Sequence, residues 1–221
     1  MMRPRSVLRW AVFSLLSLLA AAPYVAAAPP EGAVYLQPLG ESLPAEDVLL
    51  VERALRAFYG WEVKRLPPMP LPEAAYYAPR KRYRAEKLLE HLAQRLPAGG
   101  KRILGLTAVD ISTTKGSVED WGIMGLATLD GRVGVISAFR ARKGAKSARH
   151  ARERLAKVAV HELGHTLGLE HCPVRGCLME DARGKVATCD REHDLCPRCR
   201  AFLRRAKIGI PERPEIPWPR P

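Results

Sequence analysis

A short run of histidines with one neighbouring glutamate constrains the fold and function of this 221-residue chain more than any other feature of the sequence. It extends from His161 to His171 and has the pattern His-Glu-x-x-His-x-x-Gly-x-x-His. Residues four apart on an α-helix lie on one face about one turn from each other, so His161 and His165 can direct ring nitrogens at one ion. His171 can reach that ion only if the helix ends after His165 and the chain turns back. Gly168 permits the turn, because a residue without Cβ adopts the left-handed conformation that ends helices.

Three imidazoles form the ligand set of a catalytic zinc site, which leaves the fourth position to water. Zinc lowers the pKa of such a water to about 7, from about 15.7 in free water. Glu162 stands next to the first ligand and could take this proton while the zinc polarises a scissile carbonyl. A bare His-Glu-x-x-His also occurs on ordinary amphipathic helices, as a polar helix end with exposed histidines. Gly168 and His171, both in register, favour the metal site over that alternative.

Four further cysteines have the spacing of a closed structural zinc site. Cys172 and Cys177 are separated by four residues, and Cys196 and Cys199 are separated by two. The alternative is a disulfide within each pair, because disulfides persist in an oxidising compartment. We favour zinc, since a structural site contributes about 10 to 16 kcal/mol to folding and bound thiolates resist oxidation. The fifth cysteine, Cys189, is interpreted as a small thiol without a role.

Together the two motifs resemble the archaemetzincins, a small branch of the metzincin metallopeptidases. The shared pattern covers residues 161–199 and joins two metal sites in a fixed order, with Met179 between the cysteine pairs. The resemblance implies that Glu162 is the general base and that Met179 lies in a turn beneath the catalytic metal. It also implies two zinc ions, one catalytic and one structural. The implied ligands are His161, His165 and His171 for the first ion, and Cys172, Cys177, Cys196 and Cys199 for the second.

The resemblance also implies a fold of the α+β or mixed α/β class. It comprises a twisted mixed sheet with an antiparallel edge strand, a long active-site helix, and a small C-terminal part with the four-cysteine zinc site and a helix. The edge strand is expected to hold an extended peptide, so the implied partner is a peptide or protein substrate. We expect the protein to be a monomer.

The first 27 residues are typical of a secretory signal peptide. Three arginines precede an apolar run from Trp10 to Ala22, and Val25-Ala26-Ala27 provides a small-residue cleavage site; the arginines are Arg3, Arg5 and Arg9. The apolar run is too short to span a bilayer comfortably, so we expect cleavage after Ala27 and no stable membrane insertion afterwards. The sequence therefore predicts a secreted or periplasmic protein, for which nucleic acid is a poor candidate partner.

Hydrophobic patterning predicts a single domain over residues 28–210 and a proline-rich surface tail over residues 211–221. The predicted strands are 33–36, 61–63, 103–109, 122–129 and 132–139, and the last two form a hairpin through Asp130-Gly131. The predicted helices are 46–58, 82–96 and a metal-binding helix that begins near Ser147. Residues 67–79 are rich in proline and predict an irregular surface excursion.

The formal net charge is +13, and seven lysines and arginines lie between Arg140 and Arg154. We interpret this basic stretch as a solvated loop and the outer face of a helix start; the alternative is a patch that attracts acidic peptides, anionic lipid or cell-wall polymer. The sequence thus predicts an exported zinc-dependent metallopeptidase in which Glu162 activates a zinc-bound water. The alternative is a non-catalytic zinc-binding module that binds peptides or acidic polymers through its basic surface. Glu162 favours catalysis, because a site that only binds has no need of a base.

Overall fold

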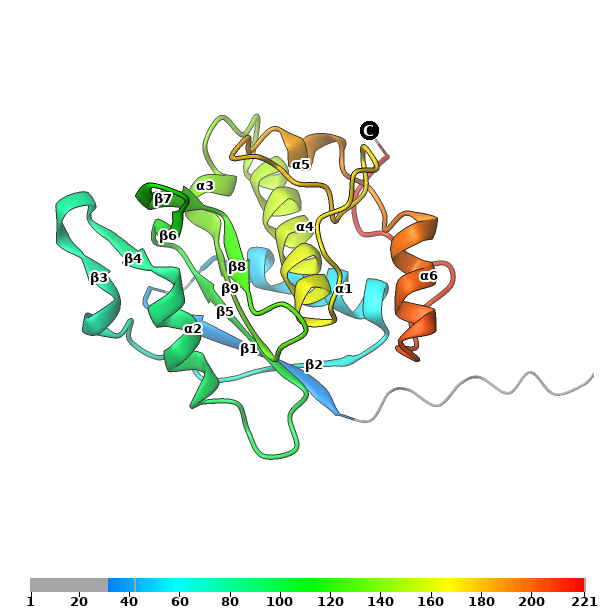
Figure 1. The fold of residues 1–221 in the computed structure, drawn as a ribbon, viewed down its shortest axis with the longest axis horizontal. Helices are drawn as coiled ribbons and strands as arrows, with labels where there is room; N and C mark the ends of the chain where they lie inside the picture. Colours follow the sequence, from blue (N-terminus) through cyan, green and yellow to red (C-terminus); the bar gives the residue numbers. More distant parts are fainter. Residues whose placement is uncertain (1–31, 42, 221) are drawn as a thin grey trace, which may run out of the picture.

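The computed structural model describes residues 32–41 and 43–220 (Figure 1). The predicted signal peptide therefore lies outside the described residues. Within the described part, no helix combines the length and the apolar content that crossing a membrane requires.

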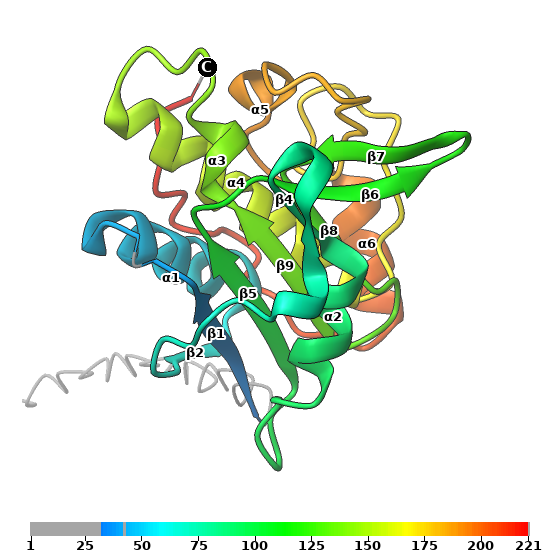
Figure 2. The same ribbon diagram turned by 90° about the vertical axis from the view of Figure 1, so that its left-hand side faces the viewer.

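A five-stranded mixed sheet lies at the centre of the molecule, in the order β2-β1-β5-β9-β8 (Figure 2). Four of its strands pair in parallel: β1 (Ala33–Leu39), β2 (Glu62–Arg65), β5 (Arg102–Thr107) and β9 (Val133–Ser137). The fifth strand, β8 (Gly125–Ala127), runs antiparallel to β9 and forms one edge of the sheet. The predicted mixed sheet with an antiparallel edge strand is confirmed.

Helices cover both faces of this sheet (Figure 1). The long helix α4 (Ala148–Thr166) packs beside α1 (Ala45–Tyr59) on one face, and α2 (Ala85–Ala93) covers the other. Neighbouring residues of a strand point to opposite faces, so Leu104 belongs to the core under α1 and α4 while Ile103 belongs to the core under α2. Both residues are fully buried, which explains the continuous apolar run of this central strand.

Local chemistry sets both ends of α4. At its start, the Ser147 side chain accepts a hydrogen bond from the backbone N–H of His150 at 3.1 Å, as an N-cap does. At its end, Gly168 has a φ of +84°. The N–H of Leu169 bonds to the carbonyl of Gly164, and the N–H of Gly168 bonds to that of His165, the pair of bonds that defines a Schellman motif. The helix therefore begins and turns where the sequence predicts.

A second sheet of four short strands was absent from the sequence prediction. Its order is β3-β4-β6-β7, and its strands are β3 (Tyr76–Tyr77), β4 (Arg82–Arg84), β6 (Ile111–Lys115) and β7 (Val118–Ile123). Arg82 fixes β4 against the rest of this sheet, because its guanidinium pairs with Asp110 at 2.8 Å and Asp120 at 2.9 Å. Most of these strand residues are polar and only partly buried, so the sequence shows no apolar alternation there.

This second sheet corrects three predicted elements. Residues 82–84 form β4, so the helix predicted from residue 82 begins only at Ala85. The excursion predicted over 67–79 contains η1 (Glu73–Ala75) and β3, and η2 (Ala78–Arg80) follows. The strand predicted over 122–129 is divided between β7 and β8 at Met124, while β8 and β9 form the predicted hairpin. β9 ends at Ser137, where the short helix α3 (Ala138–Ala141) begins.

The C-terminal part adds two short helices, α5 (Thr188–Arg191) and α6 (Pro197–Arg205). The described tail after residue 210 contains no helix or strand. The prediction that this tail lies on the surface is wrong at Trp218. That side chain is 4% exposed and stacks on Phe58 with ring centres 5.5 Å apart. Its indole N–H donates to the carbonyl of His193 at 3.1 Å, so the end of the tail belongs to the core.

The basic stretch from Arg140 to Arg154 is held largely by ion pairs within the fold. Arg154 is 4% exposed and binds both carboxylate oxygens of Asp190, at 2.6 and 2.8 Å. This hydrogen bonding lowers the pKa of Asp190 to about 2. Arg142 and Arg152 pair with Asp47, and Arg140 pairs with Asp110. The predicted solvated face is confirmed for the exposed side chains of Arg142, Lys143, Lys146 and Arg149.

We expect Trp218→Ala to destabilise the protein by about 3 to 5 kcal/mol, because it removes a large buried ring and leaves a cavity beside Phe58. Urea unfolding of the zinc-loaded protein measures this loss. Glu215→Ala, an exposed change in the same tail, should stay within about 0.5 kcal/mol of wild type. A loss below about 1 kcal/mol for Trp218→Ala would show that the tail does not belong to the core.

Candidate active site and metal centres

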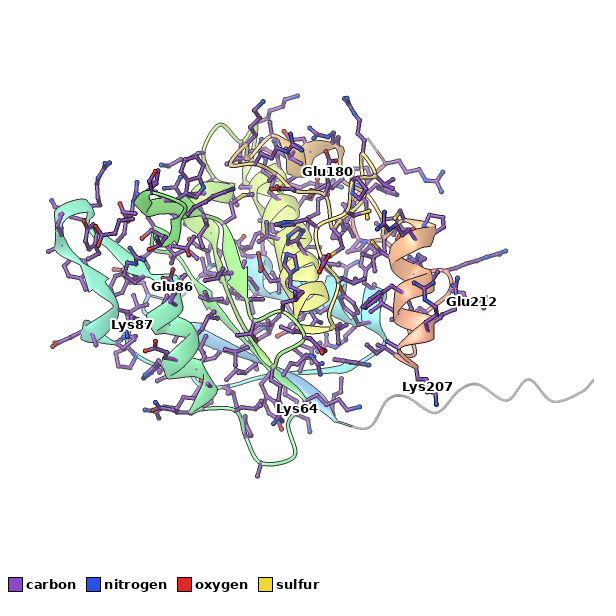
Figure 3. The ribbon with its side chains drawn as sticks, viewed as in Figure 1. Lys64, Glu86, Lys87, Glu180, Lys207 and Glu212 are labelled. Atoms are coloured by element: carbon purple, nitrogen blue, oxygen red, sulfur yellow. The ribbon has the colours of Figure 1, made fainter. Side chains whose placement is uncertain are left out.

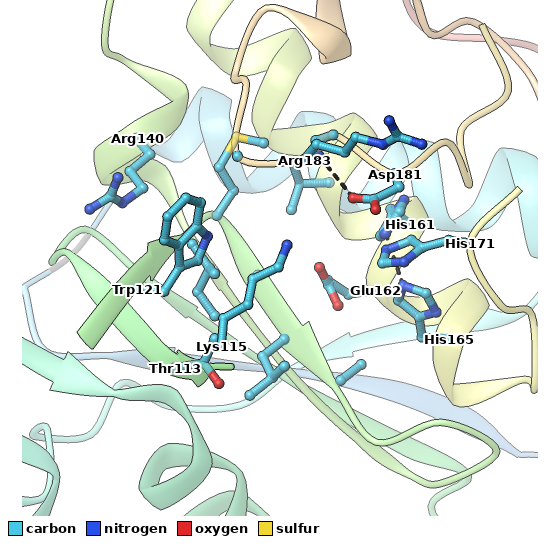
Figure 4. A pocket seen from close by; sticks show the side chains of 18 of the residues that line it. Thr113, Lys115, Trp121, Arg140, His161, Glu162, His165, His171, Asp181 and Arg183 are labelled. Carbon is cyan, nitrogen blue, oxygen red and sulfur yellow. Dashed lines mark hydrogen bonds between the residues drawn. The ribbon is translucent and has the colours of Figure 1, made fainter. Parts of the chain in front are cut away.

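Three histidines converge at the C-terminal end of α4 (Figure 4). One ligand atom from each of His161, His165 and His171 can be chosen so that all three lie within 4.8 Å of one another. The Nε2 atoms of His161 and His165 are 2.9 Å apart. Tetrahedral zinc with bonds of 2.0 to 2.1 Å sets its nitrogen ligands about 3.3 Å apart, so the cluster has the size that one ion requires.

Backbone carbonyls orient two of the three rings. Nδ1 of His161 lies 2.7 Å from the carbonyl oxygen of Leu178, and Nδ1 of His165 lies 2.7 Å from that of Leu169. Each Nδ1 must donate its hydrogen to the carbonyl, so each Nε2 carries a lone pair. Two lone pairs that face each other at 2.9 Å repel unless a cation lies between them. The donor set therefore fits a zinc ion.

Burial keeps these imidazoles in the form that binds metal. It lowers the pKa of His161 to about 3 and also lowers the pKa of His165. Both rings are therefore neutral near pH 7, and a metal ion does not have to displace a proton from either Nε2.

Glu162 lies beside the histidines and is 5% exposed (Figure 4). Its Oε2 atom is buried and has no hydrogen-bond partner among the described residues. Burial raises the pKa of Glu162 to about 8. This raised proton affinity suits Glu162 to hold a proton taken from water, and the positive charge of a zinc ion at the histidines would favour the ionised form that accepts the proton.

Gly125 of the edge strand β8 provides the space for this carboxylate. A Cβ at Gly125 would lie 2.4 Å from Oε1 of Glu162, so any other residue would displace the carboxylate. The contact joins an edge strand to a helix far along the chain. Sequence analysis missed Gly125 because nothing in the local pattern of β8 signals this approach.

The histidines and Glu162 line a cavity of about 720 Å³. Its other wall comes from the β6–β7 hairpin, which supplies Lys115 and Trp121 (Figure 4). The Nζ of Lys115 lies 5.6 Å from the centre of the Trp121 ring system. Trp121 also meets the loop after α4, where a Cβ at Gly184 would lie 2.7 Å from the indole. The hairpin, which sequence analysis missed, thus closes over the cavity from the side opposite the histidines.

The four cysteines form a second centre. Their sulfurs all lie within 4.8 Å of one another, and three pairs are 3.6 or 3.7 Å apart. Tetrahedral zinc with bonds of about 2.3 Å sets its sulfur ligands about 3.8 Å apart, whereas bonded sulfurs are about 2.05 Å apart. All five cysteines of the described part are free. The cluster therefore has the size of a zinc site, and Cys189 is buried outside it.

Cys177 anchors the turn that lies between the two centres. Its sulfur accepts the backbone N–H of Met179 at 3.5 Å and that of Cys196 at 3.4 Å. A hydrogen bond from the Cys199 thiol lowers the pKa of Cys177 to about 5, so Cys177 is a thiolate, the form that binds metal, at neutral pH.

Met179 lies beneath the part of α4 that carries the histidines. It is fully buried, and a Cβ at Gly164 would lie 2.6 Å from its sulfur. The structure therefore places Met179 in a turn packed against the active-site helix.

The fold and the two centres define a zinc metallopeptidase, with a long helix bearing histidines beside an antiparallel edge strand. The sequence model of peptidase family M54 matches residues 64–205. The archaemetzincin of Haloarcula marismortui is 36% identical over an alignment that covers 75% of this chain and 96% of the relative. The archaemetzincin of Haloquadratum walsbyi is 33% identical over an alignment that covers 77% of this chain and 98% of the relative. The crystal structure of the Methanopyrus kandleri archaemetzincin matches with a TM-score of 0.70 and 31% identity, covering 79% of this chain and 94% of that one. This chain belongs to the archaemetzincin family.

Replacing Cys196 with Ser should lower the zinc content from two ions per chain to one, because it removes one of the four sulfur ligands. Atomic absorption on the purified protein measures the content. His165→Ala should also leave one ion, so the double variant should retain none. A wild-type content of one ion that Cys196→Ser does not change would contradict the cysteine site.

Gly125→Ala should lower kcat/KM for peptides by about 10- to 100-fold with zinc content unchanged, because the new methyl group displaces the Glu162 carboxylate. Assays of a zinc-loaded protein on a quenched fluorescent peptide measure this. Gly209→Ala is the matched control, since a Cβ there meets nothing within 4 Å. Equal activity of both variants would show that Gly125 does not position Glu162.

Proposed function

We propose that this chain is an exported zinc peptidase in which Glu162 is the general base. The observation that carries the proposal is the buried Glu162 carboxylate, with an unpartnered oxygen, beside the histidine cluster. His161, His165 and His171 hold the catalytic zinc in this proposal. Cys172, Cys177, Cys196 and Cys199 hold a second, structural zinc.

When bound, zinc polarises the scissile carbonyl and activates the attacking water. Glu162 accepts the proton of that water and then donates it to the departing amine, which is the usual double role of such a carboxylate. Its pKa, raised by burial, favours holding the proton between these two steps. The free edge of β8 offers backbone groups to an extended peptide, which binds them independently of its side chains.

Export is proposed from the sequence of residues 1–27, whose charged start, apolar run and small-residue cleavage site form a signal peptide. The substrate would then be a peptide or protein met outside the cytoplasm, and the protein would act as a monomer without nucleic acid or stable membrane insertion. The basic stretch gives little support to the alternative of a module that binds acidic polymers, because much of its charge is neutralised within the fold.

Glu162→Gln should retain zinc and reduce peptide hydrolysis below detection, since the amide cannot accept the proton of the water. A time course on a peptide library followed by mass spectrometry measures hydrolysis, and atomic absorption measures zinc. Undiminished cleavage by this variant would reject Glu162 as the base. Absence of cleavage by wild type as well would favour a binding module.

The mature protein should begin at Ala28 when the full chain is expressed in a bacterial host. Intact-mass measurement of protein from the periplasm or the medium checks this. A chain that keeps residues 1–27 and stays in the cytoplasmic fraction would reject export, and the variant Ala27→Arg should block the cleavage.

A further inference from the structure

The cavity extends beyond the histidines toward the start of α4. Val158 lies one turn before Glu162 on the same face of the helix and also lines the cavity. The segment around α5 packs against α4 and contributes Cys189 and Glu192 to the lining. One turn of helix spans about 5.4 Å, so a long side chain of a substrate held beside Glu162 can reach this end.

The Glu192 carboxylate is buried at this end without a cationic partner. The residue is 3% exposed, and no Lys, Arg or His nitrogen of the described residues lies within 4.0 Å of its oxygens. Burial raises the pKa of Glu192 to about 8, an effect that the charge of Lys157 only partly opposes. A buried carboxylate without an ion pair is costly, and next to a ligand cavity it indicates a binding role.

Lys157 acts on Glu192 from outside the cavity. Its ammonium donates to the carbonyl of Cys189 at 2.8 Å and lies 5.6 Å from the centre of the Trp218 ring system. Lys157 is 5% exposed and is not part of the cavity lining. Its position therefore leaves the cavity side of Glu192 open to another cation.

Two other charged groups of the lining, Glu180 and Arg140, already have partners within the fold. Glu180 lies near α5 (Figure 3), where Arg191 and the backbone N–H of Gly176 bind its carboxylate. Lys115 and Arg140 lie across the cavity from the histidines (Figure 4), and Arg140 is bound to Asp110. The end of the cavity at Glu192 therefore presents a buried carboxyl group that forms no ion pair with a cation of the described residues, and an incoming cation would favour its ionised form.

We propose that Glu192 selects substrates with a basic side chain, lysine or arginine, close to the cleaved bond. The inference rests on the proposed function, because it assigns a specificity-determining residue to the same site. The apolar stem of the basic side chain packs against Val158 and Val186, and its charged end binds the carboxylate. Arginine fits best, since its planar guanidinium can bind both carboxylate oxygens.

Peptides that carry either arginine or citrulline at one position test this directly, because citrulline has nearly the same shape and no charge. The variable position is moved along both sides of the cleaved bond. For zinc-loaded wild type we expect kcat/KM to be about 10- to 100-fold higher with arginine than with citrulline at one position. Glu192→Gln should abolish this preference. Its kcat/KM for the citrulline peptide should stay within about twofold of the wild-type value.

Glu170→Gln is the matched control, because it makes the same chemical change at an exposed residue of the same cavity. It should keep the arginine preference. The comparison of the two peptides in wild type requires no substitution, so it remains decisive even if Glu192→Gln folds poorly.

Binding to zinc-loaded Glu162→Gln separates this inference from the proposed mechanism. Measured by fluorescence anisotropy, the Kd of the arginine peptide should be about 10-fold lower than that of the citrulline peptide. Adding Glu192→Gln to this variant should remove the difference. Equal Kd and equal kcat/KM for both peptides at every position would overturn the role of Glu192. Tighter binding of the arginine peptide without any hydrolysis by wild type would support Glu192 and reject the peptidase mechanism.

Discussion

The hydrogen bond between Nδ1 of His161 and the carbonyl of Leu178 is the interaction on which the active site depends. It ties the active-site helix to the turn next to Cys177, whose sulfur belongs to the second centre. A metal ion held by the cysteines would therefore fix the carbonyl that orients a ligand of the first ion. In this arrangement the small C-terminal part braces the active site as well as adding stability.

The same helix couples the chemistry to the substrate. Glu162 projects from α4 toward Gly125, so the proposed general base lies directly against the strand that would bind a peptide backbone. The β6–β7 hairpin closes the opposite side through Trp121 (Figure 4). Main-chain pairing along β8 would bind many sequences equally, so discrimination between substrates must come from side chains of the cavity, such as Glu192.

The histidine and cysteine clusters could be predicted from the sequence because their geometry is local. His161 and His165 share one helical turn, Gly168 turns the chain within the next few residues, and the cysteines follow as two closely spaced pairs, the second at the start of α6. The central strands could be predicted for a similar reason, since β5 and β9 are short apolar runs with turn signals beside them.

The residues that shape the cavity could not be predicted, because their roles depend on contacts between distant segments. Gly125 meets Glu162 across the sheet edge, and Glu192 reaches the cavity only because α5 packs on α4. The β6–β7 hairpin lacks apolar alternation, since its strands are only partly buried. Trp218 lies in a proline-rich tail, where composition indicates a surface position although Phe58 provides a buried one.

Anomalous diffraction at the zinc edge, from crystals of the zinc-loaded protein, tests the central claim most directly. The account predicts one peak at about 2.0 to 2.1 Å from a nitrogen of each of His161, His165 and His171, and a second peak at about 2.3 Å from the four sulfurs. It also predicts that Nδ1 of His161 remains within hydrogen-bond distance of the Leu178 carbonyl. An empty histidine cluster, or a metal that binds without His171, would contradict it.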